Sequence, residues 1–274
     1  MHNLLRVKDL NVSYRGADAK LRDAVAGVSF EIAPGEVLGL MGESGCGKTT
    51  TALALLGLLS PEQAEVSGFV QFQGQEPLSM KQRELRALRG AGISMVFQEP
   101  EMALSPVMRA GDQVAEVIHA HKALSWKECR AEAEAALVRV GLPGTQRIYS
   151  AHPHQLSGGQ RQRVVLAQAL ACEPALIIAD EPTASLDARS QKDLLALLRQ
   201  LNRTMGIAIL LISHTPEVQA YLADRLMVMA GGRIVEQGRF EDLYRHANHA
   251  LTKKMLRTSL PAKIAEELDL EMVT

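Results

Sequence analysis

One segment of eight residues, Gly42 to Thr49, constrains the fold of this chain more than any other feature. It matches, at every fixed position, the pattern of a glycine, four variable residues, a second glycine, a lysine and then serine or threonine. An apolar run, residues 37–41, precedes it, and residues 48–59 have helical character. Glycines let the backbone turn tightly so that N–H groups point inward, and the following helix presents its positive end. Strand, loop and helix together predict a cradle for phosphate groups.

Two residues of this cradle, Gly42–Thr49, have specific expected roles. Lys48 is expected to reach the β- and γ-phosphates of a nucleotide, and the Thr49 hydroxyl is expected to ligate Mg²⁺. Cys46 is expected to act through its backbone N–H, with its thiol partly exposed. The expected nucleotide-binding residues are Gly42, Glu43, Ser44, Gly45, Cys46, Gly47, Lys48, Thr49 and Thr50. Taken alone, the loop could also be a glycine-rich turn that binds nothing, or a site for free phosphate or sulfate.

A pair of acidic residues ends a second apolar run. Residues 176–179 read as a buried strand, and Asp180 and Glu181 follow it. Asp180 is placed to hold Mg²⁺, usually through water, and Glu181 to polarise an attacking water as a general base. The alternative is a solvated strand end followed by a turn at Pro182.

A third motif, the signature, lies between the cradle and the acidic strand and just before a predicted helix. It consists of Leu156, Ser157, Gly158, Gly159 and Gln160. Ser157 can cap the helix, and the two glycines leave backbone N–H groups accessible to an anion. An ordinary loop-to-helix cap would share these residues, but the position between the other two motifs disfavours that interpretation.

The three motifs, in this order, resemble those of the ATP-binding-cassette (ABC) ATPases. The resemblance covers roughly residues 1–240. Tyr14 resembles the aromatic residue that stacks on adenine, Gln98 the glutamine that touches Mg²⁺ and the attacking water, and His214 the switch histidine that contacts the γ-phosphate. Alone, Tyr14 reads as an ordinary strand aromatic and His214 as a capping or core histidine. The D-loop of the family is matched by Ser185, Leu186 and Asp187.

This resemblance implies ATP hydrolysis, with ATP and Mg²⁺ as cofactors. The implied catalytic residues are Glu181, His214 and Gln98, and the implied Mg²⁺ ligands are Thr49, Gln98 and Asp180. It also implies that two cassettes face each other head to tail, so that the signature of one chain acts on the nucleotide of its partner. The motion then passes to membrane chains beside Gln98.

The pattern of strands and helices predicts an α/β fold of the P-loop NTPase type, with a mainly parallel sheet at its core. Strand-like residues 4–14 and 24–32 predict an N-terminal antiparallel β-subdomain, and residues 230–233 predict a hairpin turn. Strand signals are missing from about residue 99 to 157, which predicts a helical subdomain inserted in the ATPase domain, residues 1–240. A helical C-terminal tail is expected over residues 241–274.

Composition and spacing indicate the branch of the family. The net charge of −1 gives no reason to expect a nucleic-acid partner, and no apolar run approaches the length of a membrane span. The stretch between Gln98 and Leu156 is too short for long coiled-coil arms, and the chain has one cradle and one signature. These features favour a transporter subunit. The alternatives are a soluble ABC ATPase acting on nucleic acid or ribosomes, and a cassette that binds ATP without hydrolysing it.

Three further segments, residues 97–106, 152–163 and 249–256, resemble the oligopeptide/dipeptide/nickel importer group. That resemblance implies uptake of peptides, nickel, a metallophore or a similar small solute. The implied partners are a second ABC ATPase subunit (a related chain or a second copy), two transmembrane permeases and, indirectly, a solute-binding protein. The expected location is peripheral, on the cytoplasmic face of the bacterial inner membrane. The lack of a cysteine after Cys172 leans toward the shorter nickel- or metallophore-type members.

Overall fold

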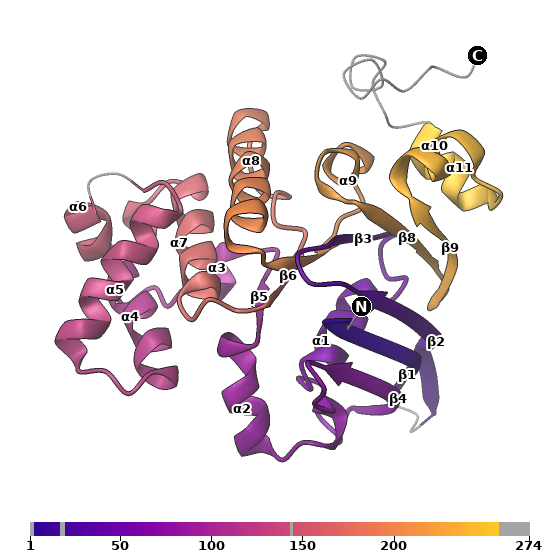
Figure 1. Ribbon diagram of the computed structural model, residues 1–274, viewed down its shortest axis with the longest axis horizontal. Helices are drawn as coiled ribbons and strands as arrows, with labels where there is room; N and C mark the ends of the chain where they lie inside the picture. The colour runs from indigo at the N-terminus through magenta and orange to yellow at the C-terminus, as the bar shows by residue number, and fades with distance from the viewer. Residues whose placement is uncertain (1–2, 17–19, 143–144, 258–274) are drawn as a thin grey trace. The chain divides into compact units, whose positions relative to one another are not determined.

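The computed structural model describes residues 3–16, 20–142 and 145–257 (Figure 1). Its internal contacts divide the chain into two compact units. The first combines residues 1–81 with the C-terminal part from residue 208, and the second comprises residues 82–207.

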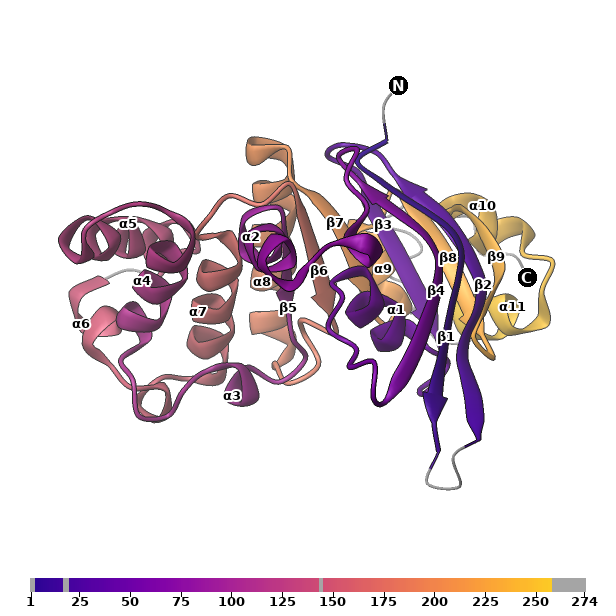
Figure 2. The same ribbon diagram turned by 90° about the horizontal axis from the view of Figure 1, so that it is seen from below.

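An antiparallel sheet opens the first unit, as the sequence predicts. It contains β1 (Leu5–Arg15), β2 (Leu21–Ile32) and β4 (Ala64–Phe72), which run side by side in the order β2-β1-β4 (Figure 2). Alternate residues of β1 are buried, because one face of the sheet packs against the protein and the other meets solvent. Helix α1 (Lys48–Leu55) contacts β1 and β2.

The first unit also contains parallel strands. β3 (Val37–Gly42) lies between β7 (Ala208–Ile212) and β8 (Arg225–Ala230), parallel to both. All residues of β3 and β7 are buried, which suits parallel strands covered on both faces. β9 (Arg233–Arg239) pairs with β8 in the predicted hairpin, whose turn is Gly231–Gly232. Helix α9 (Pro216–Leu222) connects β7 to β8.

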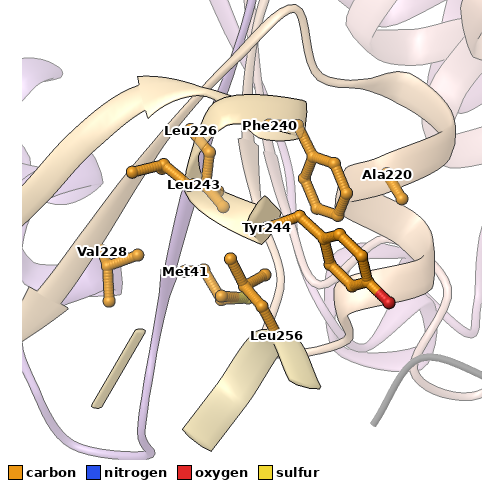
Figure 3. Packing of buried hydrophobic residues seen from close by; sticks show 8 residues of the cluster. All are labelled: Met41, Ala220, Leu226, Val228, Phe240, Leu243, Tyr244 and Leu256. Atoms are coloured by element: carbon orange, nitrogen blue, oxygen red, sulfur yellow. The ribbon is translucent and has the colours of Figure 1, made fainter. Parts of the chain in front are cut away.

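Two helices follow β9 and pack on the same core. α10 (Phe240–His246) and α11 (Ala250–Arg257) bury Leu243, Tyr244 and Leu256 in a cluster with Met41 of β3 and Leu226 of β8 (Figure 3). The carboxylate of Glu236 on β9 accepts hydrogen bonds from the N–H groups of Asn248 (2.6 Å) and His249 (3.1 Å), and so fixes the start of α11. The rest of the predicted tail, residues 258–274, lies outside the described residues.

The second unit is mostly helical around one parallel strand pair. β5 (Ile93–Val96) pairs with β6 (Leu176–Asp180). Among the described residues between 99 and 157 there are helices and turns and no strand. The helices of the unit are α2 (Gln82–Ala91), α3 (Pro100–Ala103), α4 (Ala110–His121), α5 (Trp126–Arg139), α6 (Thr145–Ser150), α7 (Gly158–Leu170) and α8 (Ala188–Met205). The short helices α3 and α6 were not predicted from the sequence pattern. Within the described part of the chain, no helix has the length and apolar character needed to cross a membrane.

Candidate active site

The backbone of the cradle depends on its glycines. Gly45 and Gly47 have φ angles of 76° and 109°, in the left-handed region that favours glycine. A Cβ atom at Gly47 would lie 2.3 Å from the carbonyl oxygen of Ala24, and one at Gly42 would lie 2.4 Å from that of Met229. The chain therefore leaves no room for side chains at these two positions. At Gly45 a Cβ atom would meet nothing within 4 Å, so the loop is open there.

Lys48 lies inside the cradle. Its side chain is only 8% exposed, and its Nζ donates to the carbonyl oxygens of Gly42 (2.8 Å) and Glu43 (3.0 Å). Helix α1 begins at Lys48 and has no acidic residue in its first turn, so no carboxylate of that turn offsets its positive end. Thr49, next in the chain, is exposed. A buried cation, a positive helix end and an accessible hydroxyl fit the triphosphate of ATP and its Mg²⁺.

Tyr14 lies beside the helix that follows the cradle. It is the penultimate residue of β1 and is half-buried, and its hydroxyl oxygen is 3.3 Å from the Thr50 hydroxyl oxygen of α1. The structure thus brings Tyr14 to the predicted nucleotide-binding residues.

The thiol of Cys46 is buried, which corrects the expectation of partial exposure. The residue is 8% exposed, and its Sγ lies 3.9 Å from Lys48 Nζ. Burial raises the pKa of the Cys46 thiol above its ordinary value, although the Lys48 ammonium acts in the opposite direction. The thiol is therefore a weak nucleophile at neutral pH.

The C-terminal helix α11 also reaches the cradle, which sequence reasoning missed. Lys254 Nζ lies 3.2 Å from Glu43 Oε1, across a sequence separation of 211 residues. Both side chains are mostly exposed, so the pair adds little to stability. It shows that α11 and the loop after β3 are neighbours. No local signal in the sequence marks such a distant pair.

His214 follows β7 at the same edge as the cradle. β3 and β7 are parallel neighbours, with Gly39 opposite Leu211 and Leu40 opposite Ile212. Because carboxyl ends of parallel strands meet at one edge of a sheet, the cradle after β3 and His214 after β7 share that edge. The His214 side chain is exposed.

Acidic and amide side chains follow the two strands of the second unit. β5 and β6 are parallel, with Val96 opposite Ala179, so Gln98 and the pair Asp180 and Glu181 lie at one edge. Asp180 and Glu181 are 5% and 8% exposed, and Gln98 is exposed. Glu181 has a φ of 47°, a left-handed conformation that is uncommon for a residue with a side chain. Such strained positions concentrate at functional sites.

The signature and the D-loop meet in the second unit. Ser157 caps α7 by accepting a hydrogen bond from the Gln160 N–H (3.3 Å), while Gln160 Oε1 accepts one from the Ser157 N–H (3.0 Å). Leu156 is buried next to this cap. Ser157, Gly159, Gln160, Leu186 and Ser190 line a shared cavity of about 250 Å³.

Ser190 joins these two motifs. A Cβ atom at Gly159 would lie 3.5 Å from its hydroxyl oxygen, and that hydroxyl donates to Asp187 Oδ2 (2.8 Å). Asp187 begins helix α8, and hydrogen bonds from Ser190, first that of its backbone N–H, hold the pKa of the Asp187 carboxyl below its ordinary value. Ser190 was not identified from the sequence, since a serine in the first turn of a helix is unremarkable.

The predicted site residues thus gather at three places within the two units. The cradle, Tyr14 and His214 belong to the first unit; Gln98, Asp180 and Glu181 follow β5 and β6; and the signature adjoins the D-loop at Ser190.

Comparisons with known proteins identify the family and the fold. A family model described as ABC transporter matches residues 25–184. The dipeptide transport ATP-binding protein DppD of Bacillus subtilis is 40% identical over 257 residues, which cover 93% of this chain and 76% of that protein. The oligopeptide transport ATP-binding protein OppD of Salmonella typhimurium is 42% identical over 246 residues, covering 90% and 73%.

A solved structure shows the same fold. It is a dimeric ATP-binding cassette in a post-hydrolysis state bound to ADP and Pi, with a TM-score of 0.76 and 29% sequence identity. The match covers 86% of this chain and 98% of that one. The predicted α/β fold of the P-loop NTPase type, with an antiparallel N-terminal sheet, is confirmed.

The buried Cys46 thiol gives a test of the cradle. Because its pKa is raised, its alkylation by iodoacetamide is expected to be slower at pH 7 than that of free glutathione. The rate should rise about tenfold per pH unit until the pH passes the raised pKa. MgATP should slow the reaction by covering the loop. Mass spectrometry of the modified peptides measures this, and Cys172 serves as the internal control that MgATP leaves unchanged. Rapid alkylation of Cys46 at pH 7 that is insensitive to MgATP would contradict its placement.

Proposed function

Because this chain belongs to the ABC transporter family of ATP-binding proteins, we propose that it is the ATP-hydrolysing subunit of an importer for peptides or a similar small solute. The observation that carries the proposal is the buried Lys48 in a glycine-dependent cradle at the start of α1. ATP hydrolysis with Mg²⁺ is the activity of the family to which the chain belongs.

The chemistry of hydrolysis is assigned to a few side chains. Lys48 exchanges its two loop carbonyl partners for β- and γ-phosphate oxygens and neutralises their charge. The proposed Mg²⁺ ligands are Thr49, Gln98 and Asp180, and the ion would offset the negative charge of the phosphates. The Glu181 carboxylate, whose residue has the uncommon positive φ, accepts a proton from the attacking water. His214 contacts the γ-phosphate from the end of β7.

The glycines of the signature support pairing with a second cassette. Neither Gly158 nor Gly159 has a positive φ. A Cβ atom would meet nothing within 4 Å at Gly158, and only ordinary contact with Ser190 at Gly159. The described chain itself therefore gives no steric reason for glycine there, in contrast to Gly42 and Gly47 of the cradle. We propose that the close approach of a partner's nucleotide supplies the reason, with Ser157 and Gly159 completing that site.

Exposed apolar side chains on both sides of Gln98 support docking of a permease. Phe97, Met102 and Val107 are 41%, 82% and 81% exposed. Near Val107 the segment is tied to helix α4, because the Gln113 amide accepts from the Ser105 N–H (2.8 Å) and donates to the Ser105 carbonyl oxygen (3.0 Å). An ordered segment with protruding apolar side chains suits a protein interface. We assign it to a membrane-spanning partner.

The names of the relatives guide the choice of solute. DppD and OppD are dipeptide and oligopeptide transport proteins, which favours a peptide over nickel or a metallophore. The assembly we propose contains this chain, a second ABC ATPase subunit and two permeases at the cytoplasmic face of the bacterial inner membrane. A solute-binding protein delivers the solute to the permeases. A soluble ABC ATPase acting on nucleic acid or ribosomes is the alternative, and the transport relatives do not favour it.

Removal of the general base is the first test. Glu181→Gln should retain ATP binding but lower steady-state ATP turnover by about 100-fold or more, the usual contribution of general-base catalysis. It should also accumulate an ATP-bound dimer, measured by size-exclusion chromatography. Glu173→Gln is a matched control, because Glu173 is also a glutamate with a positive φ (53°) but is exposed ahead of β6. Normal turnover in Glu181→Gln would show that another group activates water.

Docking to permeases is tested by purification with the proteins of neighbouring genes. Wild-type chain should bring down two multi-span membrane proteins. Met102→Arg with Val107→Arg should lose them, because a charge cannot enter an apolar interface without a partner. Val138→Arg on α5 is the control, since Val138 is 60% exposed but lies outside the proposed surface. Recovery of a nucleic acid or a ribosome in place of permeases would overturn the transporter assignment.

A further inference from the structure

A buried amide of helix α9 holds the end of the strand that leads to His214. Gln219 is completely buried, although glutamine is usually exposed. Its Nε2 donates to the carbonyl oxygens of Ser213 (3.1 Å) and Leu211 (3.3 Å). The Ser213 carbonyl belongs to the peptide bond that joins Ser213 to His214. Gln219 therefore holds the peptide plane from which His214 projects.

The strand next to β7 is shaped to admit this side chain. A Cβ atom at Gly39 of β3 would lie 2.1 Å from Gln219 Oε1, so the amide occupies the space that a side chain at position 39 would fill. Gly39 lies opposite Leu211 in the parallel ladder. The amide of Gln219 on α9 thus fits into the space that Gly39 leaves on β3, next to the carboxyl end of β7.

Stability alone does not account for a glutamine at this position. Gln219 Oε1 is buried and has no hydrogen-bond partner, which costs free energy. The next residue, Ala220, belongs to the apolar cluster with Met41 and Leu226 (Figure 3). An unbranched apolar side chain such as methionine would fill a similar volume without an unsatisfied oxygen. What methionine could not do is donate to the two carbonyl groups of the strand end.

Other hydrogen bonds fix the residues on both sides of His214. The Ser213 N–H donates to the Leu40 carbonyl oxygen of β3 (3.3 Å), and the Thr215 N–H donates to the Ser213 hydroxyl oxygen (3.2 Å). Ser213 is 1% exposed, whereas His214 is exposed. The chain therefore leaves the core at His214, and hydrogen bonds hold the backbone just before it. The side-chain amide of Gln219 links that backbone to helix α9.

We propose that Gln219 is a positioning residue for His214 in ATP hydrolysis. It acts through the Ser213–His214 peptide and does not touch the nucleotide. The proposal rests on the proposed role of His214 at the γ-phosphate. Loss of the two donated hydrogen bonds should let the imidazole depart from its productive position, which lowers turnover but leaves binding of ATP through the cradle intact.

The test measures steady-state ATP hydrolysis and the Kd for a fluorescent ATP analogue, using the full chain. Gln219→Met should lower kcat about five- to tenfold, the loss expected for one or two hydrogen bonds, with Kd changed less than about twofold. Its melting temperature should stay close to that of the wild type, because removal of the unsatisfied Oε1 offsets the loss of the donor to the two carbonyl oxygens. Glu217→Gln on the same helix is the control and should behave as wild type. Gln219→Leu provides a second apolar variant if Gln219→Met does not fold.

A double-mutant cycle separates this proposal from the role of His214 itself. In the His214→Ala background, Gln219→Met should cause no further loss of kcat, because the group it positions is gone. The positioning role would be overturned if the kcat losses of the two single variants multiplied in the double variant. It would also be overturned by a wild-type kcat in Gln219→Met, by an effect confined to Kd, or by failure of both apolar variants to fold. Wild-type turnover in His214→Ala alone would instead refute the assignment of the switch histidine.

Discussion

The close approach of neighbouring strands to the cradle is the constraint on which the rest of this structure depends. Carbonyl oxygens of Ala24 and Met229 occupy the space where Gly47 and Gly42 would carry side chains. The Gly232 N–H donates to the Cys46 carbonyl oxygen (3.0 Å), so the β8–β9 turn also supports the loop. These contacts constrain the backbone of the loop from more than one side. The preorganised loop then needs little rearrangement when it binds an anion.

The parallel arrangement of the strands also explains where the proposed catalytic side chains lie. Within each unit, parallel strands bring their carboxyl ends to one edge: Lys48 and His214 follow strands of the first unit, and Asp180 and Glu181 come at the end of a strand of the second. In the proposed mechanism, burial of the carboxylates and the ammonium would strengthen their interactions with charges that develop during hydrolysis. The signature differs because its glycines have no steric explanation within the described chain. This observation supports the proposal that the chain forms half of an ATPase.

Much of this was predictable from the sequence because the motifs are local. Glycine spacing predicts the turn after β3, and apolar runs followed by Asp180 or His214 predict buried strands that end at a polar edge. The predicted hairpin near Gly232 is confirmed for the same reason. Long-range contacts were not predictable. Nothing near Lys254 indicates that it reaches Glu43, the burial of Cys46 depends on packing around the loop, and Gln219 looks like an ordinary polar residue of a short helix.

Isothermal titration calorimetry of the full chain with MgATP measures nucleotide binding by the cradle directly. Lys48→Ala should weaken binding at least about 30-fold, because removal of one member of a desolvated charge pair costs about 2–5 kcal/mol. Lys253→Ala, an exposed lysine of α11, should bind MgATP as the wild type does. Equal affinity in Lys48→Ala and wild type would contradict the assignment of Gly42–Thr49 as the phosphate site.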